Sequence, residues 1–329
     1  MYSEIVKNLL VFTGELIKPT DIPRVAKDYY RGVLRFLLVL HHDFPEFLAE
    51  NNYRFCCSIP MHCTQLRNLV ISAYPSYFPE LPDPFTAGLK VDRLEEIRKS
   101  PKIRGDIEAP LVTGGIKNVL DNLLLGSEIN DADLATICDA AYQPRRLETG
   151  FGFAPVTVDT VLLHALALYI GISAIKMASP KGQTFNSSSS HARLLERLAR
   201  KLRPEARYHF ISAIVNQLRY PNSHTHYFSY ALLHLFGAQG VQGTAQESEI
   251  AQQITRVLLE RLLVHRPHPW GLIITLLETL KNSSYQFWNL PFVKATPEVR
   301  LSCSFGSWAP YVVPLLLRIW LLYVNSGLG

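Results

Sequence analysis

Apolar residues recur along much of the chain at spacings of three and four, the period of an amphipathic helix. Residues 206–218 and 254–262 each place their apolar side chains on one stripe, with polar side chains on the opposite side. Residues 31–40 and 161–174 are apolar over most of the helical circumference. Since both stretches are shorter than the ~20 residues of a bilayer span, they predict helices buried in a protein core.

Strand signals are few, and the helical stretches are separated by short segments rich in Pro, Gly or Ser. Successive helices joined by short loops are typical of stacked helical pairs of the HEAT type. The sequence therefore predicts an all-α fold of stacked HEAT-like helices. We expect one domain over residues 1–299, with the Ser-rich loop 179–190 as its only candidate internal boundary, followed by an atypical apolar tail at 300–329.

Composition narrows the class of protein further. Of the 329 residues, 48% are hydrophobic and 11% aromatic, which excludes a disordered chain. The formal net charge of +5 is carried by scattered residues and points to no particular ligand. The odd number of cysteines predicts reduced thiols in a cytosolic or nuclear protein; they are Cys56, Cys57, Cys63, Cys138 and Cys303.

Motifs for catalysis or cofactor binding are missing from the sequence. The pair Gly150 and Gly152 lacks the further glycines and the Lys-Ser/Thr of a phosphate-binding loop. The nucleophile elbow G-x-S-x-G, the zinc motif H-E-x-x-H and a C-x-x-C pair do not occur. We therefore predict no catalytic residue, no bound cofactor and no metal site, and a protein that is not an enzyme.

Three clusters of potential ligands have a simpler interpretation. His224 and His226 lie two positions apart at the entry of a predicted helix, so that they point to opposite sides, which favours packing over a metal site. The run His41-His42-Asp43 reads as the polar end of a helix. The group at residues 56–63, with three cysteines and His62, matches no known zinc spacing and favours core packing.

A basic segment offers an alternative function. Six basic residues crowd residues 193–207, around a leucine stripe. Such a helix can face phosphates, and an RNA-binding helical repeat is the alternative to a protein-binding one. A solvated outer face, whose side-chain stems cover the edge of the core, is the simpler interpretation. The six are Arg193, Arg197, Arg200, Lys201, Arg203 and Arg207.

Several long segments of the sequence, which we call phrases, are distinctive. Residues 32–48 read GVLRFLLVLHHDFPEFL, residues 216–229 read NQLRYPNSHTHYFS and residues 253–272 read QITRVLLERLLVHRPHPWGL. Together they closely resemble the C-terminal homology domain of the large scaffold subunit of the eukaryotic CCR–NOT deadenylase complex. The resemblance runs from about residue 31 to about residue 299 and is loose over 100–150.

The resemblance implies stacked HEAT-like helices and a non-enzymatic role. In that family the domain docks the Not-box subunits, the second and the third or fifth Not proteins, whose extended segments wrap around its helices. RNA-binding regulators also use it to recruit the complex. The resemblance thus implies a scaffold in the nucleus and cytoplasm that acts in mRNA decay, translational repression and transcription regulation, with direct nucleic-acid or membrane binding not expected.

Extended partner segments dock in grooves lined by aromatic side chains and rimmed by hydrogen-bonding groups. The matched phrases and the residues after them supply both kinds, although the same residues can instead set the turns between helices or fill the core. The candidate partner-binding residues are Arg219, Tyr220, Asn222, His224, His226, Tyr227, Phe228, His268, Trp270 and Trp288.

The tail departs from the family pattern. After residue 300 the chain becomes apolar, and residues 308–324 carry Pro314 and Arg318 within a mostly apolar run. That length is marginal for a membrane span. We expect an atypical terminus rather than a docked core helix or an anchor.

Overall fold

Helices build almost the whole molecule. The computed structural model describes residues 1–18, 21–86, 89–126, 129–144, 156–178, 185–238 and 244–294. The α-helices are α1 (Tyr2–Leu16), α2 (Arg24–Asp43), α3 (Pro45–Glu50), α4 (Asn52–Ser58), α5 (Thr64–Ser72), α6 (Glu108–Thr113), α7 (Lys117–Leu125), α8 (Asp131–Ala140), α9 (Thr160–Ala178), α10 (Ser190–Lys201), α11 (Pro204–Val215), α12 (Ser223–Gly237), α13 (Ala245–Leu262), α14 (Trp270–Lys281) and α15 (Pro291–Lys294). Four 3₁₀ helices accompany them: η1 (Val91–Arg93), η2 (Glu95–Arg98), η4 (Ser283–Tyr285) and η5 (Phe287–Asn289).

Local sequence signals explain where several helices begin. The side chains of Asn130, Ser189 and Asn222 each accept a hydrogen bond from a backbone N–H in the first turn of α8, α10 and α12. Thr244 and Glu247 form a reciprocal capping box at the start of α13. These caps satisfy N–H groups that have no partner within the helix.

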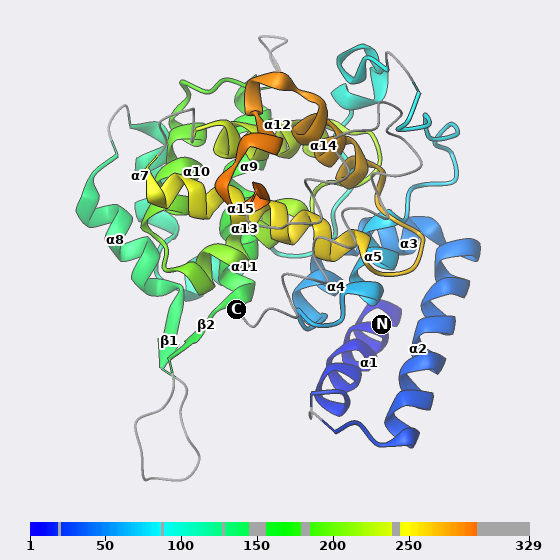
Figure 1. The fold of residues 1–329 in the computed structure, drawn as a ribbon. Helices are drawn as coiled ribbons and strands as arrows, with labels where there is room; N and C mark the ends of the chain where they lie inside the picture. The colour runs from blue at the N-terminus through cyan, green and yellow to red at the C-terminus, as the bar shows by residue number, and fades with distance from the viewer. Residues whose placement is uncertain are drawn as a thin grey trace.

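The body of the molecule is a stack of helices around α9. Helices α10, α11 and α12 pack against α9 (Figure 1). Helix α13 packs on both α11 and α12, and α14 packs on α12. Gly171 allows the closest of these approaches, because a Cβ there would overlap the ring of Phe228 on α12. The prediction of an all-α, HEAT-like stack is confirmed. The one addition among the described residues is a short antiparallel pair, β1 (Tyr142–Pro144) with β2 (Val156–Val158).

Helix α9 is also the one described helix that is long and apolar enough to cross a membrane. Ten of its residues, from Leu162 to Ala174, are buried inside the protein. Its sequence thus forms the predicted core helix.

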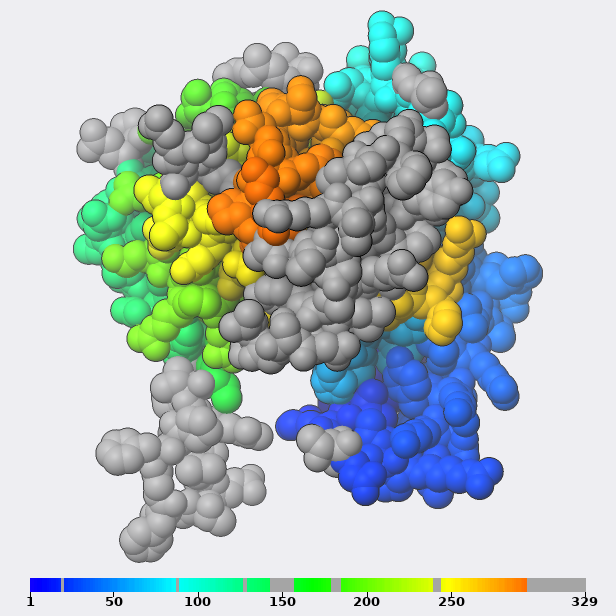
Figure 2. All heavy atoms as spheres, viewed as in Figure 1, coloured from blue at the N-terminus to red at the C-terminus, as the bar shows by residue number. Residues whose placement is uncertain are grey.

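The first five helices form an N-terminal lobe with a separate apolar cluster. Helices α1 and α2 project from the body as a hairpin, and their atoms form a distinct region at the lower right of Figure 2. The prediction that residues 31–40 are buried all round is wrong. Val33 and Leu37 face the cluster, whereas Phe36 and Val39 are 40% and 52% exposed, because this helix packs on neighbours along one side only.

Two buried arginines act at the N-terminal lobe: Arg219 joins it to the body, and Arg67 bonds within it. Arg219 donates to the carbonyl of Ala49 at 2.7 Å, and Arg67 donates to the carbonyls of Cys56 and Ile59. These carbonyls lie at the C-terminal ends of α3 and α4, where helix carbonyls lack partners and the helix dipole is negative. Each guanidinium therefore meets partial negative charge without a carboxylate.

Two of the sequence-based boundaries are not tested by the fold. Residues 179–184, the first half of loop 179–190, and all of the tail 300–329 lie outside the described residues. The division into one domain and a tail stays a prediction.

Candidate functional site

The two most distinctive phrases of the sequence meet in space. The turn at residues 216–222 joins α11 to α12, and the first turn of α14 packs directly against it. The backbone N–H of Gly271 donates to the carbonyl of Arg219 at 2.6 Å. Gly271 is needed there, because a Cβ would lie 2.5 Å from Cγ2 of Thr225 and 2.9 Å from the carbonyl oxygen of Arg219. The residues before α12 and those that open α14 therefore form one continuous internal surface, and residues 216–228 within it are buried.

Asn222 and Thr225 fix this turn. The amide of Asn222 donates to the carbonyl of Tyr220 at 2.6 Å, and its oxygen caps α12 by accepting from the N–H of Thr225. The hydroxyl of Thr225 also lies 2.8 Å from the Tyr220 carbonyl. Asn222 thus has a structural role in the turn, which is one of the two roles that the sequence left open.

A long connecting segment of the chain crosses this surface. We call residues 73–107, which join α5 to α6, the strap; Ala87 and Gly88 within it lie outside the described residues. The indole N–H of Trp270 donates to the carbonyl of Pro82 at 2.7 Å, and the ring of Tyr220 packs edge-on against Phe78. The strap, coloured in cyan shades in Figure 1, therefore contacts several of the predicted docking residues.

Asp92 in η1 makes a further contact between the strap and α12. One of its carboxylate oxygens lies 2.7 Å from Nε2 of His226, and the hydroxyl of Tyr230 donates to the same oxygen at 2.9 Å. Burial, together with the hydrogen bond to Asp92, raises the pKa of Tyr230 to about 12. This contact joins η1 to α12.

A pocket of about 590 Å³ opens between the strap, α12 and α14. Of the ten predicted residues, it brings together Asn222, His226 and Trp270. Sequence reasoning missed the residues that follow at helical spacing from His226, namely Tyr230 and Leu233, which line the same wall. The period of α12 could have found them, because positions four and seven residues on share a helix face.

Other predicted residues point into the core instead. Tyr227 and Phe228 are 2% and 0% exposed, and both belong to the main apolar cluster. His224 is 5% exposed, and burial, assisted by the positive charge of Arg219, lowers its pKa to about 3. Burial also lowers the pKa of Arg219. Partner contact by these residues remains a prediction that their present burial does not favour.

His268 and Trp288 lie apart from the pocket, and both are half-buried. Burial, together with the charge of Arg266, lowers the pKa of His268. Trp288 packs edge-on against Phe287 at the margin of the main apolar cluster. The ten predicted residues therefore do not form a single site.

The predicted ligand clusters show their packing roles. Cys56 and Cys63 are buried in the N-terminal cluster, and Cys57 lies 3.3 Å from Nδ1 of the buried His164. Burial raises the pKa of Cys57 to about 12, so that it is a thiol at neutral pH. Across the described part of the chain, no three His, Cys, Asp or Glu side chains are placed to hold a metal ion.

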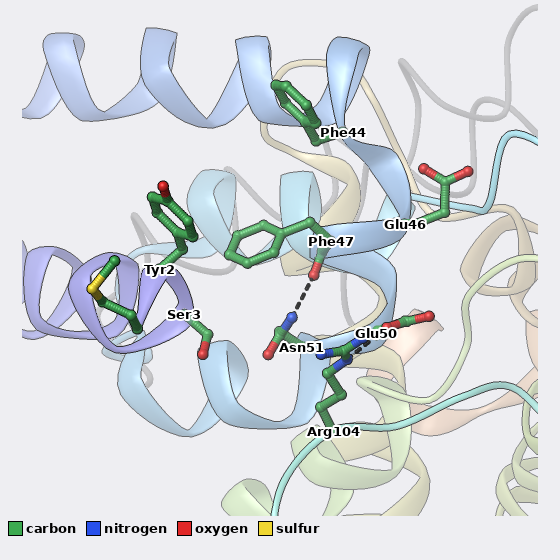
Figure 3. A pocket seen from close by; sticks show the side chains of 9 residues that line it. Tyr2, Ser3, Phe44, Glu46, Phe47, Glu50, Asn51 and Arg104 are labelled. Carbon is green, nitrogen blue, oxygen red and sulfur yellow. Dashed lines mark hydrogen bonds and ion pairs between the residues drawn. The ribbon is translucent and has the colours of Figure 1, made fainter.

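A second hollow, of about 520 Å³, lies at the N-terminal lobe and contains none of the ten predicted residues. Tyr2, Phe44 and Phe47 gather along one side of it, and Glu50 is paired with Arg104 at the other (Figure 3). The side chain of Asn51 closes its base by donating to the carbonyl of Phe47.

The basic segment is divided between two helices and partly neutralised. Arg197 pairs with Asp131, and Arg200 pairs with Glu196 and Glu247. Arg207 lies on α11, is 2% exposed and contacts Glu249 and Gln253, so its placement on the basic face is wrong. Three of the six basic side chains thus form ion pairs within the protein, whereas Lys201 and Arg203 are exposed.

Comparison with known proteins places this fold and surface in a family. The family model "CCR4-Not complex component, Not1" matches residues 1–304. The chain belongs to the Not1 family. Two curated relatives are the CCR4-NOT transcription complex subunit let-711 of Caenorhabditis elegans and the general negative regulator of transcription subunit 1 of Schizosaccharomyces pombe. They are 38% and 39% identical over 304 and 305 residues, each covering 91% of this chain.

Two solved Not1 structures share the fold. The NOT1 superfamily homology domain from Chaetomium thermophilum has a TM-score of 0.83 and 37% identity, and the match covers 96% of this chain and 60% of that one. A Not1 C-terminal domain in complex with Not4 has a TM-score of 0.75 and 29% identity, covering 91% and 57%. The resemblance to the C-terminal Not1 homology domain is therefore confirmed, and with it membership of a non-enzymatic scaffold family. The chain spans only 11% and 14% of the length of the two curated relatives.

Proposed function

We propose that this chain is a docking module of the CCR4-NOT complex that binds the Not-box subunits, the second and the third or fifth Not proteins, along its helical surface. Through them, and through RNA-binding regulators that use the same module, it supports deadenylation of mRNA, translational repression and transcription regulation. It would act in the nucleus and the cytoplasm, without a cofactor, a metal ion or a membrane.

The proposal rests on where the segments that resemble the family lie in the folded structure. Residues 216–229 and 266–272, distant in sequence, pack against each other beside a pocket of about 590 Å³, which Asn222, His226 and Trp270 line. The pocket has aromatic and polar walls, which is the composition of a peptide-docking groove. A related Not1 domain has been solved with another protein, Not4, which supports a docking role for this type of domain.

A binding experiment tests the proposal. The purified full chain is immobilised and incubated with the heterodimer of the two Not-box subunits from the same organism. We expect a stoichiometric complex that survives size-exclusion chromatography. A correctly folded chain, checked by circular dichroism, that retains none of the heterodimer would refute the proposal.

RNA binding is the alternative function. It predicts association with single-stranded RNA that weakens steeply as salt rises, because phosphate contacts release counterions. The ion pairs of Arg197, Arg200 and Arg207 favour the docking role. Titration of a labelled oligonucleotide at three salt concentrations distinguishes the two functions.

A further inference from the structure

The pocket between the strap, α12 and α14 carries two carboxylates that form no ion pair with a lysine or an arginine among the described residues. Asp92 lies on the strap and Glu278 on α14, and both line the pocket. Among the described ion pairs, the only one made by either carboxylate is that of Asp92 with the imidazole of His226. Glu278 accepts a hydrogen bond from the neutral amide of Asn282 at 2.8 Å.

The two carboxylates face the same space. Both raise the pKa of Tyr230, Asp92 through a hydrogen bond and Glu278 through its charge. Glu278 also contributes to the raised pKa of Tyr285, another pocket residue. Two negative charges and two phenol rings therefore border one cavity.

The remaining walls suit an aliphatic chain. Leu233 on α12 and Ile274 on α14 line the same pocket as the carboxylates, together with Trp270. Aromatic faces and carboxylates attract a cation, and apolar walls accept the methylene groups that carry it. Lysine and arginine side chains combine both features.

Lys90 and Arg93 also line the pocket, from the strap. Both are exposed, and neither forms an ion pair with Asp92 or Glu278 in the part of the chain that the structure describes. Their positive charges offset those of the two carboxylates at the rim of the pocket, and they leave both carboxylates available to a bound side chain.

We propose that this pocket binds a lysine or arginine side chain of an extended partner segment, with the cation held between Asp92, Glu278 and Tyr230. This inference rests on the proposed docking function and adds the chemistry of one subsite. The stem of the guest lies along Leu233 and Ile274, and its backbone follows the groove between η1 and α14.

A pair of peptides tests the subsite directly. The capped pentapeptides acetyl-Gly-Leu-Arg-Leu-Gly-amide and its citrulline analogue differ in charge and have almost the same shape. We expect the arginine peptide to shift the indole N–H resonance of Trp270, assigned with Trp270→Phe, at least tenfold more strongly at equal concentration. Equal shifts for the two peptides, or none for either, would overturn the proposal.

Variants connect the subsite to partner binding. Glu278→Gln and Asp92→Asn should each weaken binding of the Not-box heterodimer about tenfold, whereas Glu95→Gln should leave it unchanged. Glu95 is the matched control, because it is exposed on the same strap and does not line the pocket. Melting temperatures confirm that the variants fold.

The outcomes separate the two proposals. If the heterodimer binds the wild type and all three variants equally, the subsite is wrong and the docking function stands. If the heterodimer does not bind the wild type, the docking function fails, and the peptide pair alone decides the subsite.

Discussion

At the scale of single residues, buried polar groups do most of the positioning. Arg219 and Arg67 donate to carbonyls at helix ends, and Asn68 donates across the two lobes to the carbonyl of Arg261 at 2.5 Å. Such bonds are worth most where water is excluded, because an unpaired buried carbonyl carries the full cost of its lost hydration. Arg219, which the sequence predicts as a docking residue, thus stabilises the fold of the scaffold.

Arg219→Ala tests this role. The substitution leaves a cavity and removes the donor to the Ala49 carbonyl, so we expect the free energy of unfolding to fall by about 2–4 kcal/mol. Arg219→Met should lose less, because it fills the space without burying a charge. Arg197→Ala, on the surface, should change stability by about 0.5 kcal/mol or less. Urea unfolding measures all three, and equal losses at positions 219 and 197 would contradict the account.

Buried histidines predict a stability that depends on pH. Burial lowers the pKa of both His164 and His224 from 6.5 to about 3, so the folded chain keeps them neutral. Between pH 6.5 and 3 the unfolded chain binds protons that the folded chain does not. Stability is therefore complete above pH 6.5 and falls with decreasing pH, by up to about 1.4 kcal/mol per histidine and pH unit.

His224→Gln checks the sign and the source of this effect. The variant should reduce the slope of unfolding free energy against pH between pH 6 and pH 4 by about one proton, whatever its stability at pH 7. Parallel slopes for the wild type and the variant would show that His224 does not titrate in this way.

At the scale of elements, close packing of helices sets the shape of the groove. Helix α9 approaches α12 at Gly171, and α14 approaches the turn before α12 at Gly271. Both contacts fix α12, which carries the pocket wall on one side and core residues on the other. The strap then closes the groove through Asp92 and Pro82.

Gly171→Ala should disturb this packing. The added methyl group overlaps the ring of Phe228, which is itself fully buried, so we expect a loss of about 1–3 kcal/mol. Gly32→Ala on α2 is the matched control, because nothing lies within 4 Å of its Cβ, and it should stabilise the helix by about 0.5–1 kcal/mol. Thermal unfolding distinguishes the two, and a gain at both positions would contradict the tight crossing of α9 and α12.

Much of this arrangement could be predicted from the sequence. Apolar periodicity correctly predicted the helix over residues 254–262 and the buried α9, and it predicted the helix at 206–218 apart from its end, because α11 ends at Val215. Periodicity could not show that α2 packs on one side only, since that depends on what lies next to the helix. The strap escaped prediction for a related reason: its contacts with Tyr220, His226 and Trp270 join segments more than 130 residues apart.

The candidate site shows the same limit. The phrases around residues 216–229 and 266–272 were recognised as distinctive, and the structure brings them together. Which of their side chains line the pocket depends on the rotation of α12 and on the strap. His226 and His224 are both buried, yet His226 lines the pocket and contacts Asp92, whereas His224, two positions earlier, does not line it.

At the scale of the whole molecule, a lobe of α1 to α5 is joined to a larger stack that presents the groove. Stacked helices offer long surfaces with little need for an active site, which suits a scaffold that partners bind along its length. The Chaetomium thermophilum homology domain, of which the match covers 60%, shares this architecture. The central claim is that Not-box subunits dock in the groove between the strap, α12 and α14.

Hydrogen–deuterium exchange of the full chain, with and without the Not-box heterodimer, tests that claim most directly. If the subunits dock in this groove, we expect binding to slow exchange in peptides that cover residues 89–97, 221–233 and 270–285. The exchange of α7 and α8 should stay unchanged and serves as an internal control. Formation of the complex with protection confined to α7, α8 or the α1–α2 hairpin would contradict it.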